Sequence, residues 1–234
     1  MTEVRVGQAW PAGGRPRVLR LAHRGDHRVH PENSLAAMLA AMDVPDCDGL
    51  EFDVRASLDG IPVLLHDPSL ARVQGVDAPV TELTAAQLAV HGVPRLAEVL
   101  ARVPRRAFLD VELKVDLGRS VVEVLAAGRG ADLQRAVISS FEVPAIERIR
   151  SLAPAWPCWL NTEHLRPGDV RIARELGCVG LSVNWHAIDA PGLARARAAD
   201  LEVIAWTVTD LRVSRRLESS GISAMCMEGR AFAH

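Results

Sequence analysis

Short apolar runs of strand length alternate with amphipathic stretches of helical length along most of this chain. Nine such runs occur, over 18–22, 49–54, 61–65, 107–113, 136–141, 157–161, 178–183, 201–208 and 222–227. This alternation is typical of a parallel sheet covered by helices. A single α/β barrel commonly has about 250 residues, so 234 residues suffice for one. We therefore predict an α/β fold of the TIM (β/α)8 barrel type, in which one run is not a barrel strand.

The run in excess is identified by the Asp59-Gly60 pair. A tight Asp-Gly turn joins antiparallel strands, whereas parallel neighbours need a crossover of about a dozen residues or more. The runs 49–54 and 61–65 flank this turn and cannot both be barrel strands. We assign 61–65 to a short hairpin after the second strand, which carries His66 back over the mouth of the barrel.

Helix signals lie between the runs, where the alternation requires helices. Ser34 is placed to cap a helix over 35–42, and Asp210 to cap one over 211–220 that stops at Gly221. Pro94 suits the first position of another helix.

The composition is that of a globular protein with a sizeable core, since 49% of the residues are hydrophobic and 24% are charged. We expect one barrel domain over 18–234 after a loose leader over 1–17. That leader contains no apolar block of signal-peptide length. No stretch approaches the ~18 apolar residues of a membrane span, so we expect no integral membrane association.

Charge and cysteine content narrow the classes of partner and the compartment. The formal net charge of −2 gives no electrostatic reason for a nucleic-acid partner. The four cysteines, Cys47, Cys158, Cys178 and Cys226, show no metal-binding spacing. Reduced thiols are typical of the cytosol, so we expect a cytoplasmic protein. The sequence carries no signal of oligomeric state.

Three carboxylates lie within strand-like runs in a pattern that suits a cation. Glu51 and Asp53 are two residues apart in one run, so their side chains share a face. Glu112 ends a different run. Oxygen ligands without cysteine favour Mg²⁺ or Ca²⁺, while a nearby histidine keeps Mn²⁺ as a third candidate. The alternative is that these carboxylates pair with arginines inside the barrel.

His23 and His66 each follow an apolar run, and together they suit a general acid and a general base. Lys114, two residues after Glu112, is the one lysine among 27 Lys and Arg residues. Lysine is a compact point charge that fits beside a metal or a phosphate oxygen, whereas arginine is a broad fork. A structural salt bridge in the barrel is the alternative for Lys114.

Arg24, beside His23, is placed to hold a phosphate oxygen, and an ion pair with Glu32 is compatible with that role. Trp206 ends a late apolar run. It either forms an apolar wall against a carbon backbone such as glycerol or packs in the core. These groups converge because the active sites of such barrels lie at the carboxyl ends of the strands.

With these residues in place, the chain resembles the glycerophosphodiester phosphodiesterase family, which shares its barrel with phosphatidylinositol-specific phospholipases C. The matching motifs are A-H-R-G at 22–25, P-E-N at 31–33, E-F-D-V at 51–54, D-G-I-P-V-L-L-H-D at 59–67, V-P-R-L-A-E-V-L at 93–100, E-L-K at 112–114, S-S-F at 139–141 and A-W-T-V at 205–208. They occur in order over residues 18 to about 228.

The resemblance implies a metal-dependent phosphoric diester hydrolase. It implies that His23 and His66 are the acid/base pair and that Lys114 and Arg24 neutralise the phosphate. From the residues themselves, we also expect Glu32 and Trp206 to contribute to substrate binding. Glu51, Asp53 and Glu112 are the implied metal ligands. The implied small-molecule substrates are glycerophosphodiesters, cleaved to glycerol 3-phosphate and an alcohol.

Two departures from the family pattern leave other functions open. The segment between His66 and Glu112 is shorter than usual, and Glu228 stands where the last strand usually has an aspartate. One alternative is a phospholipase D-type enzyme acting on lysophospholipids or sphingolipids. Another is a non-catalytic barrel that binds phosphate or a metal without turnover.

Overall fold

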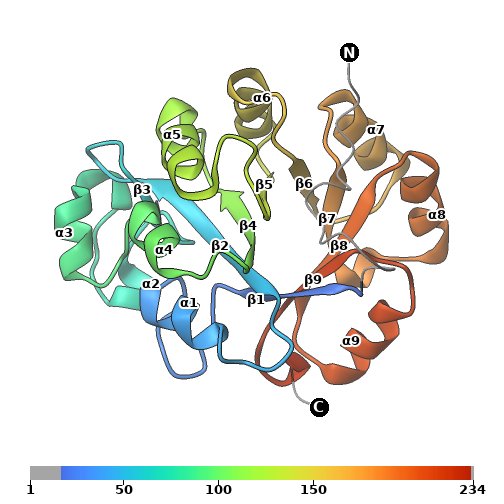
Figure 1. The fold of residues 1–234 in the computed structure, drawn as a ribbon, viewed down its shortest axis with the longest axis horizontal. Helices are drawn as coiled ribbons and strands as arrows, with labels where there is room; N and C mark the ends of the chain where they lie inside the picture. Colours follow the sequence, from blue (N-terminus) through green and yellow to red (C-terminus); the bar gives the residue numbers. More distant parts are fainter. Residues whose placement is uncertain (1–16, 233–234) are drawn as a thin grey trace.

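Eight parallel strands close into a barrel in this computed structural model, which describes residues 17–232 (Figure 1). The strands are β1 (Leu19–His23), β2 (Gly49–Ala56), β4 (Phe108–Leu113), β5 (Ala136–Ser140), β6 (Cys158–Thr162), β7 (Gly180–Asn184), β8 (Glu202–Val208) and β9 (Ala224–Met227). Pairing of β1 with both β2 and β9 closes the ring. The predicted TIM barrel is thereby confirmed. The expected leader lies outside the described residues, apart from Arg17.

The ninth apolar run forms a hairpin, as the Asp59-Gly60 turn predicts. Strand β3 (Pro62–Leu64) pairs antiparallel with the end of β2, and Leu64 lies opposite Val54. Gly60 has a φ of +73°, in the left-handed region that glycine accepts readily. The hairpin therefore ends beside the carboxyl end of β2, and His66 lies two residues beyond β3.

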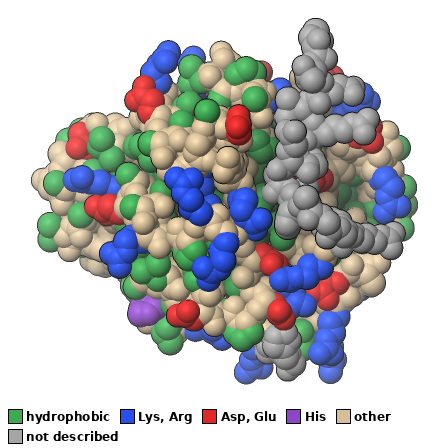
Figure 2. All heavy atoms as spheres, viewed as in Figure 1, with side chains coloured by type: hydrophobic (Ala, Val, Ile, Leu, Met, Phe, Trp, Pro, Cys, Tyr) green, Lys and Arg blue, Asp and Glu red, His purple; other side chains and the backbone are tan. Residues whose placement is uncertain are grey.

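Helices surround the barrel and cover its outer face (Figure 1). They are α1 (Leu35–Ala41), α2 (Ala71–Gln74), α3 (Ala85–Val90), α4 (Leu96–Arg102), α5 (Gly118–Arg129), α6 (Val143–Leu152), α7 (Pro167–Glu175), α8 (Ala190–Ala198) and α9 (Leu211–Glu218). Short 3-10 turns occur at η2 (Val80–Glu82), η3 (Trp185–Ala187) and η4 (Gly229–Phe232). Basic, acidic and apolar side chains all occur on the face shown in Figure 2.

Two of the three helix signals are confirmed. Ser34 accepts a hydrogen bond from the Ala37 amide, and Asp210 accepts from the first turn of α9. The signal at Pro94 is wrong by two positions, because α4 begins at Leu96. The reason is tertiary: the Pro94 carbonyl accepts a hydrogen bond from the Leu64 amide, so Pro94 pairs with the hairpin instead of entering the helix.

The core has separate layers inside and outside the barrel wall. Side chains that alternate along each strand point to opposite faces. One set of buried side chains fills the barrel interior: Leu19, Leu21, Phe108, Val137, Trp159, Ile204, Ala224 and Cys226. A larger set packs the strands against the helices, and a third lies beneath the hairpin. The interior of the barrel is therefore apolar, whereas its mouth, at the carboxyl ends of the strands, is polar.

Among residues 17–232, no helix combines the length and the apolar character that crossing a bilayer requires.

Candidate functional site

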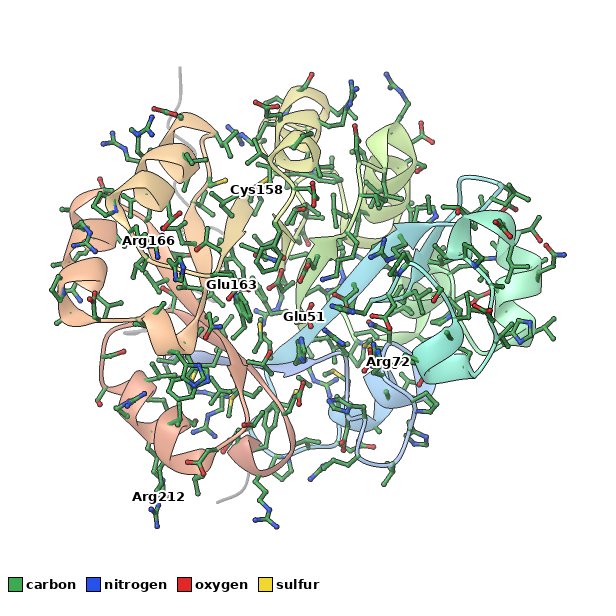
Figure 3. The ribbon with its side chains drawn as sticks, turned by 180° about the vertical axis from the view of Figure 1, so that it is seen from behind. Glu51, Arg72, Cys158, Glu163, Arg166 and Arg212 are labelled. Carbon is green, nitrogen blue, oxygen red and sulfur yellow. The ribbon has the colours of Figure 1, made fainter. Side chains whose placement is uncertain are left out.

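The inward positions of the barrel strands change from apolar to polar toward the mouth. On β4, Phe108 belongs to the apolar interior, and Asp110 and Glu112 follow it at intervals of two residues. The same spacing places Asn161 after Trp159 on β6. Because the two-residue period keeps one face, these polar groups stand directly above the apolar interior. Figure 3, seen from behind, shows Glu51 and Glu163 toward the centre of the barrel, with Arg212 at the periphery.

The three carboxylates that the sequence selects meet in one cluster. Glu51, Asp53 and Glu112 each bring an oxygen into a group whose members all lie within 4.8 Å of one another, and all three residues are buried. Glu51 Oε1 is buried and makes no hydrogen bond within residues 17–232. The donor set suits a hard divalent cation, and the orphaned Glu51 oxygen is a ligand atom without another partner.

Lys114 belongs to this cluster and partly neutralises it. Its Nζ lies 3.0 Å from Asp53 Oδ1, and it donates a hydrogen bond to Glu112 Oε1. Burial lowers the pKa of Lys114, but the charges of Asp53 and Glu112 outweigh burial, so its pKa is raised and the ammonium stays charged. Lys114 therefore forms the salt bridge that the alternative interpretation predicts, and its partners Asp53 and Glu112 are also candidate metal ligands.

The pKa values of the three carboxyl groups diverge. Burial, followed by the charges of Asp53 and Glu112, raises the pKa of Glu51 well above its usual range. Burial likewise raises the pKa of Glu112. Burial also acts on Asp53, but Lys114 and Arg24 outweigh it and lower the pKa of Asp53. A cation bound between the three carboxylates would relieve their repulsion.

The two histidines lie at the mouth, and each has a carboxylate partner. His23 Nδ1 lies 2.5 Å from Glu228 Oε1, and its Nε2 lies 3.7 Å from Glu51 Oε2. His66 Nδ1 lies 2.6 Å from Asp67 Oδ1. A carboxylate that accepts from Nδ1–H leaves the Nε2 lone pair free to take a proton. Burial lowers the pKa of His66, which favours this neutral form.

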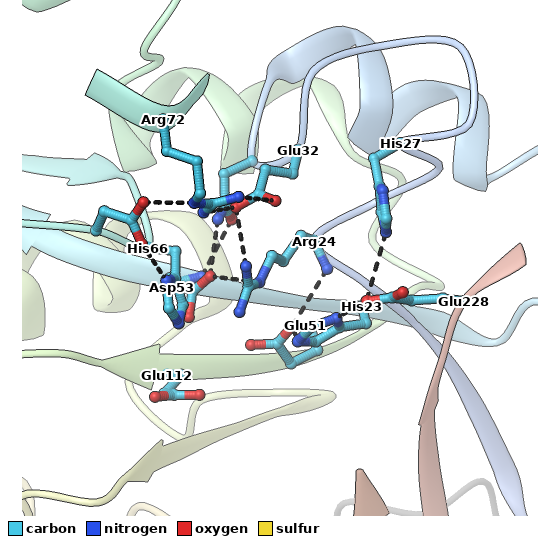
Figure 4. A network of polar contacts seen from close by, with 12 residues as sticks. His23, Arg24, His27, Glu32, Glu51, Asp53, His66, Arg72, Glu112 and Glu228 are labelled. Atoms are coloured by element: carbon cyan, nitrogen blue, oxygen red, sulfur yellow. Dashed lines mark hydrogen bonds and ion pairs between the residues drawn. The ribbon is translucent and has the colours of Figure 1, made fainter. Parts of the chain in front are cut away.

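Arg24 connects the cluster to a charged network on the outer side of the mouth (Figure 4). Its Nε lies 3.1 Å from Asp53 Oδ2, and its Nη1 donates to Glu32 Oε1 at 2.9 Å. Arg72 of α2 donates to both oxygens of Glu32 and, through Nε, to Asp67 Oδ2 at 2.5 Å. A chain of charged groups thus runs from Arg24 to Asp67, the partner of His66.

Glu32 and Asp53 are the two selected residues that do not line the cavity at the mouth. The Glu32 carboxylate is held by Arg24 and Arg72. Asn33 serves Asp53 instead: its side-chain amide donates to Asp53 Oδ2 at 2.7 Å, and its Oδ1 accepts from the Asp53 amide at 3.2 Å. The P-E-N motif therefore orients Arg24 and Asp53.

A cavity of about 240 Å³ opens at the mouth beside the carboxylate cluster. Its lining residues are His23, Arg24, Glu51, His66, Asp110, Glu112, Lys114, Phe141, Asn161, Glu163, Ser182, Trp206, Thr207 and Cys226. Trp206 meets Phe141 edge to face, with ring centroids 5.5 Å apart. Phe141 is 41% exposed, so this pair forms an apolar wall open to the cavity. Trp206 is thus a wall of the cavity and not only part of the core.

Several lining residues were missed in the sequence, although a signal for them existed. Asp110, Asn161 and Ser182 stand two residues after an inward position, so the period of two extended along each strand would have identified them. Burial raises the pKa of Asp110 to about 7, and its Oδ1 has no hydrogen-bond partner among the described residues. Asp110 therefore adds a carboxyl group to the floor of the cavity.

Comparisons with known proteins agree with this geometry. A family model described as the Glycerophosphoryl diester phosphodiesterase family matches residues 23–228. A probable glycerophosphodiester phosphodiesterase of Mycobacterium tuberculosis is 30% identical over 224 residues, which cover 81% of each chain.

Two solved structures share the fold. A phosphodiesterase of Oleispira antarctica in complex with the product sn-glycerol-3-phosphate superposes with a TM-score of 0.83 at 26% identity, covering 90% of this chain and 93% of that one. A glycerophosphodiester phosphodiesterase of Thermotoga maritima gives a TM-score of 0.78 at 22% identity, covering 92% and 96% of the two chains. This second likeness concerns the fold alone.

Proposed function

Because the chain belongs to the glycerophosphoryl diester phosphodiesterase family, a family of phosphoric diester hydrolases, we propose that it cleaves glycerophosphodiesters to glycerol 3-phosphate and an alcohol. The observation that carries the proposal is the buried cluster of Glu51, Asp53 and Glu112 between two histidines at the barrel mouth. The glycerol 3-phosphate bound to the Oleispira antarctica phosphodiesterase supports a small-molecule substrate.

We propose that Glu51, Asp53 and Glu112 hold one divalent cation, Mg²⁺ or Ca²⁺, with Mn²⁺ as a third candidate. The all-oxygen donor set and the orphaned Glu51 Oε1 support this assignment. When bound, such an ion supplies positive charge that polarises a phosphoryl oxygen.

His23 and His66 act as the acid/base pair in this proposal. Each has Nδ1 against a carboxylate, so each Nε2 is the atom that exchanges a proton with the substrate. One histidine takes the proton of the attacking hydroxyl, from water or from the substrate's own glycerol. The other donates a proton to the departing alcohol oxygen. Glu228 and Asp67 hold the rings and stabilise the imidazolium that forms in turn.

Arg24 and Lys114 neutralise the charge of the phosphate in the transition state. Both line the cavity, and both are held by buried carboxylates, so they are positioned before substrate binds. Glu32 contributes through Arg24, since its own oxygens are engaged. Trp206, with Phe141, packs against the carbon atoms of the substrate.

We also propose a cytoplasmic location. All four cysteines are unpaired, and burial raises the pKa of Cys158 and Cys178 to about 12. Such thiols resist oxidation and are typical of a reducing compartment.

The direct test is turnover by metal-stripped protein with a panel of glycerophosphodiesters, with MgCl₂, CaCl₂ or MnCl₂ added back. Release of glycerol 3-phosphate is followed for the wild type, for His23→Ala and for His91→Ala, a matched substitution at an exposed histidine after α3. We expect metal-dependent release that His23→Ala abolishes and His91→Ala preserves. Lysophospholipids and sphingolipids are assayed alongside. Cleavage of these lipids alone, or ligand binding without turnover, would refute the proposed substrate class.

A further inference from the structure

A second group of potential metal ligands lies at the edge of the site and contains nitrogen donors. His23 ends β1, His27 lies in the loop after β1, and Glu228 follows β9. One ligand atom from each lies within 4.8 Å of the other two. His27 Nε2 is 3.5 Å from Glu228 Oε1, and His23 Nδ1 is 2.5 Å from the same oxygen (Figure 4). His27 Nε2 is buried and makes no hydrogen bond within the described part of the chain.

These separations suit a tetrahedral transition metal. With metal–nitrogen and metal–oxygen distances of about 2.0–2.1 Å, two ligand atoms of a tetrahedral site lie about 3.4 Å apart. The His27–Glu228 distance already has this value, and the His23–Glu228 pair must open by about 0.9 Å. The His27 and Glu228 side chains are 31% and 26% exposed, so an ion can enter and keep water as a fourth ligand.

We propose that His23, His27 and Glu228 form a site for Zn²⁺ or a similar borderline transition metal, and that an ion bound there inhibits the enzyme. Two imidazoles and one carboxylate favour zinc over Mg²⁺ or Ca²⁺, whereas the all-oxygen cluster of Glu51, Asp53 and Glu112 has the opposite preference. The two sites therefore prefer different ions, although His23 contacts Glu228 of one site and lies 3.7 Å from Glu51 of the other.

Inhibition follows from the chemistry of His23 and rests on the proposed function. A metal ion on Nδ1 takes the lone pair there, so the single proton of the neutral ring moves by tautomerisation from Nδ1 to Nε2. The neutral ring then carries its proton on Nε2 and has no free lone pair at that atom. His23 Nε2, 3.7 Å from Glu51 Oε2, can no longer accept a proton. The ion also separates His23 from Glu228, which otherwise holds the ring.

The test uses the full-length protein saturated with Mg²⁺, so that the all-oxygen cluster is occupied, and then titrated with Co²⁺ or Zn²⁺. Co²⁺ reports tetrahedral nitrogen ligation by its visible absorption bands, independently of turnover. His27→Gln removes one ligand, and His30→Gln, at an exposed histidine in the same loop, is the matched control. Changes near metal ligands commonly cost about 10–100-fold in affinity, so loss of a ligand should cost at least about tenfold.

We expect the wild type and His30→Gln to give the Co²⁺ bands and to be inhibited by Zn²⁺. His27→Gln should keep its turnover without zinc, lose the bands and need at least about tenfold more Zn²⁺ for inhibition. Equal bands and equal inhibition in His27→Gln would overturn the proposal. Absence of turnover in every variant, with the bands still dependent on His27, would refute the proposed function and leave the metal site supported.

Discussion

Binding of a divalent cation to the carboxylate cluster should release protons. The reason is the raised pKa of Glu51, which Glu51→Gln tests. The ligand oxygens of Glu51, Asp53 and Glu112 lie within 4.8 Å of one another, so two ionised members repel by at least about 3.5 kcal/mol at an effective dielectric constant of about 20. Burial is the larger cause, and together with this repulsion it raises the pKa of Glu51. A cation must therefore displace a proton that the metal-free cluster retains.

The sign of the pH dependence follows directly. Because the pKa of Glu51 is raised without the cation and falls when the cation binds, affinity increases with pH from the ordinary carboxyl range up to the raised pKa. In that window one released proton gives up to about a tenfold increase in the association constant per pH unit. Above the raised pKa, the affinity becomes independent of pH.

Calorimetric titration with Mg²⁺ or Ca²⁺ in two buffers of different ionisation enthalpy counts the protons released. Thermal unfolding gives a second measure, since a ligand at about 100 times its Kd stabilises by about 2.7 kcal/mol. For a domain of this size that corresponds to a rise in Tm of about 5–11 °C. Glu51→Gln should release fewer protons and bind the cation more weakly, while its metal-free form should be no less stable than the wild type. Cation binding by the wild type without proton release would refute the reasoning.

Three further outcomes follow from the packing and charge of the mouth and wall. Arg72→Gln should lower kcat by about tenfold, because Asp67 loses the guanidinium that holds it, and Arg72→Lys should restore part of the loss, as steady-state kinetics would reveal. Hydrogen bonding from Arg72 lowers the pKa of Asp67 to about 2, so ionised Asp67 stabilises the fold above its ordinary pKa and loses that contribution as pH falls toward 2. In Asp67→Asn, the free energy of unfolding should therefore depend less on pH between about pH 4 and 2. An unchanged acid-unfolding curve would contradict this. Gly49→Ala places a Cβ 2.0 Å from the Phe108 carbonyl oxygen, so it should lower the free energy of unfolding by about 4 kcal/mol or more. Gly168→Ala, in open space, should change that free energy by less than about 1 kcal/mol. Urea unfolding measures both.

The sequence was sufficient for the architecture, because local patterns specify it. Alternating apolar runs predict the barrel, and the Asp59-Gly60 turn separates β3 from the barrel strands. At Pro94 the local signal predicts the start of a helix, but the hydrogen bond from the Leu64 amide to the Pro94 carbonyl keeps this residue outside the helix. The family resemblance, carried by ordered motifs over most of the chain, is confirmed by the family model.

The candidate site was predicted in its parts and not in its connections. Strand ends identify His23 and Glu112, since the carboxyl ends of parallel strands lie at one mouth. The two-residue spacing within one run identifies Glu51 and Asp53. Roles within the site remain predictions.

Only the tertiary structure decided which charged groups meet. Glu228 reaches His23 across 205 residues of sequence, and Arg72 reaches Glu32 across 40. The first contact exists because β9 pairs with β1 when the barrel closes. The second joins Arg72 of α2 to Glu32 in the loop after β1. Side-chain periodicity is a local property of a strand, so the sequence by itself determined which residues face the mouth. Closure is a property of the whole ring, and together with the placement of the segments outside the strands it determined which charged groups become partners.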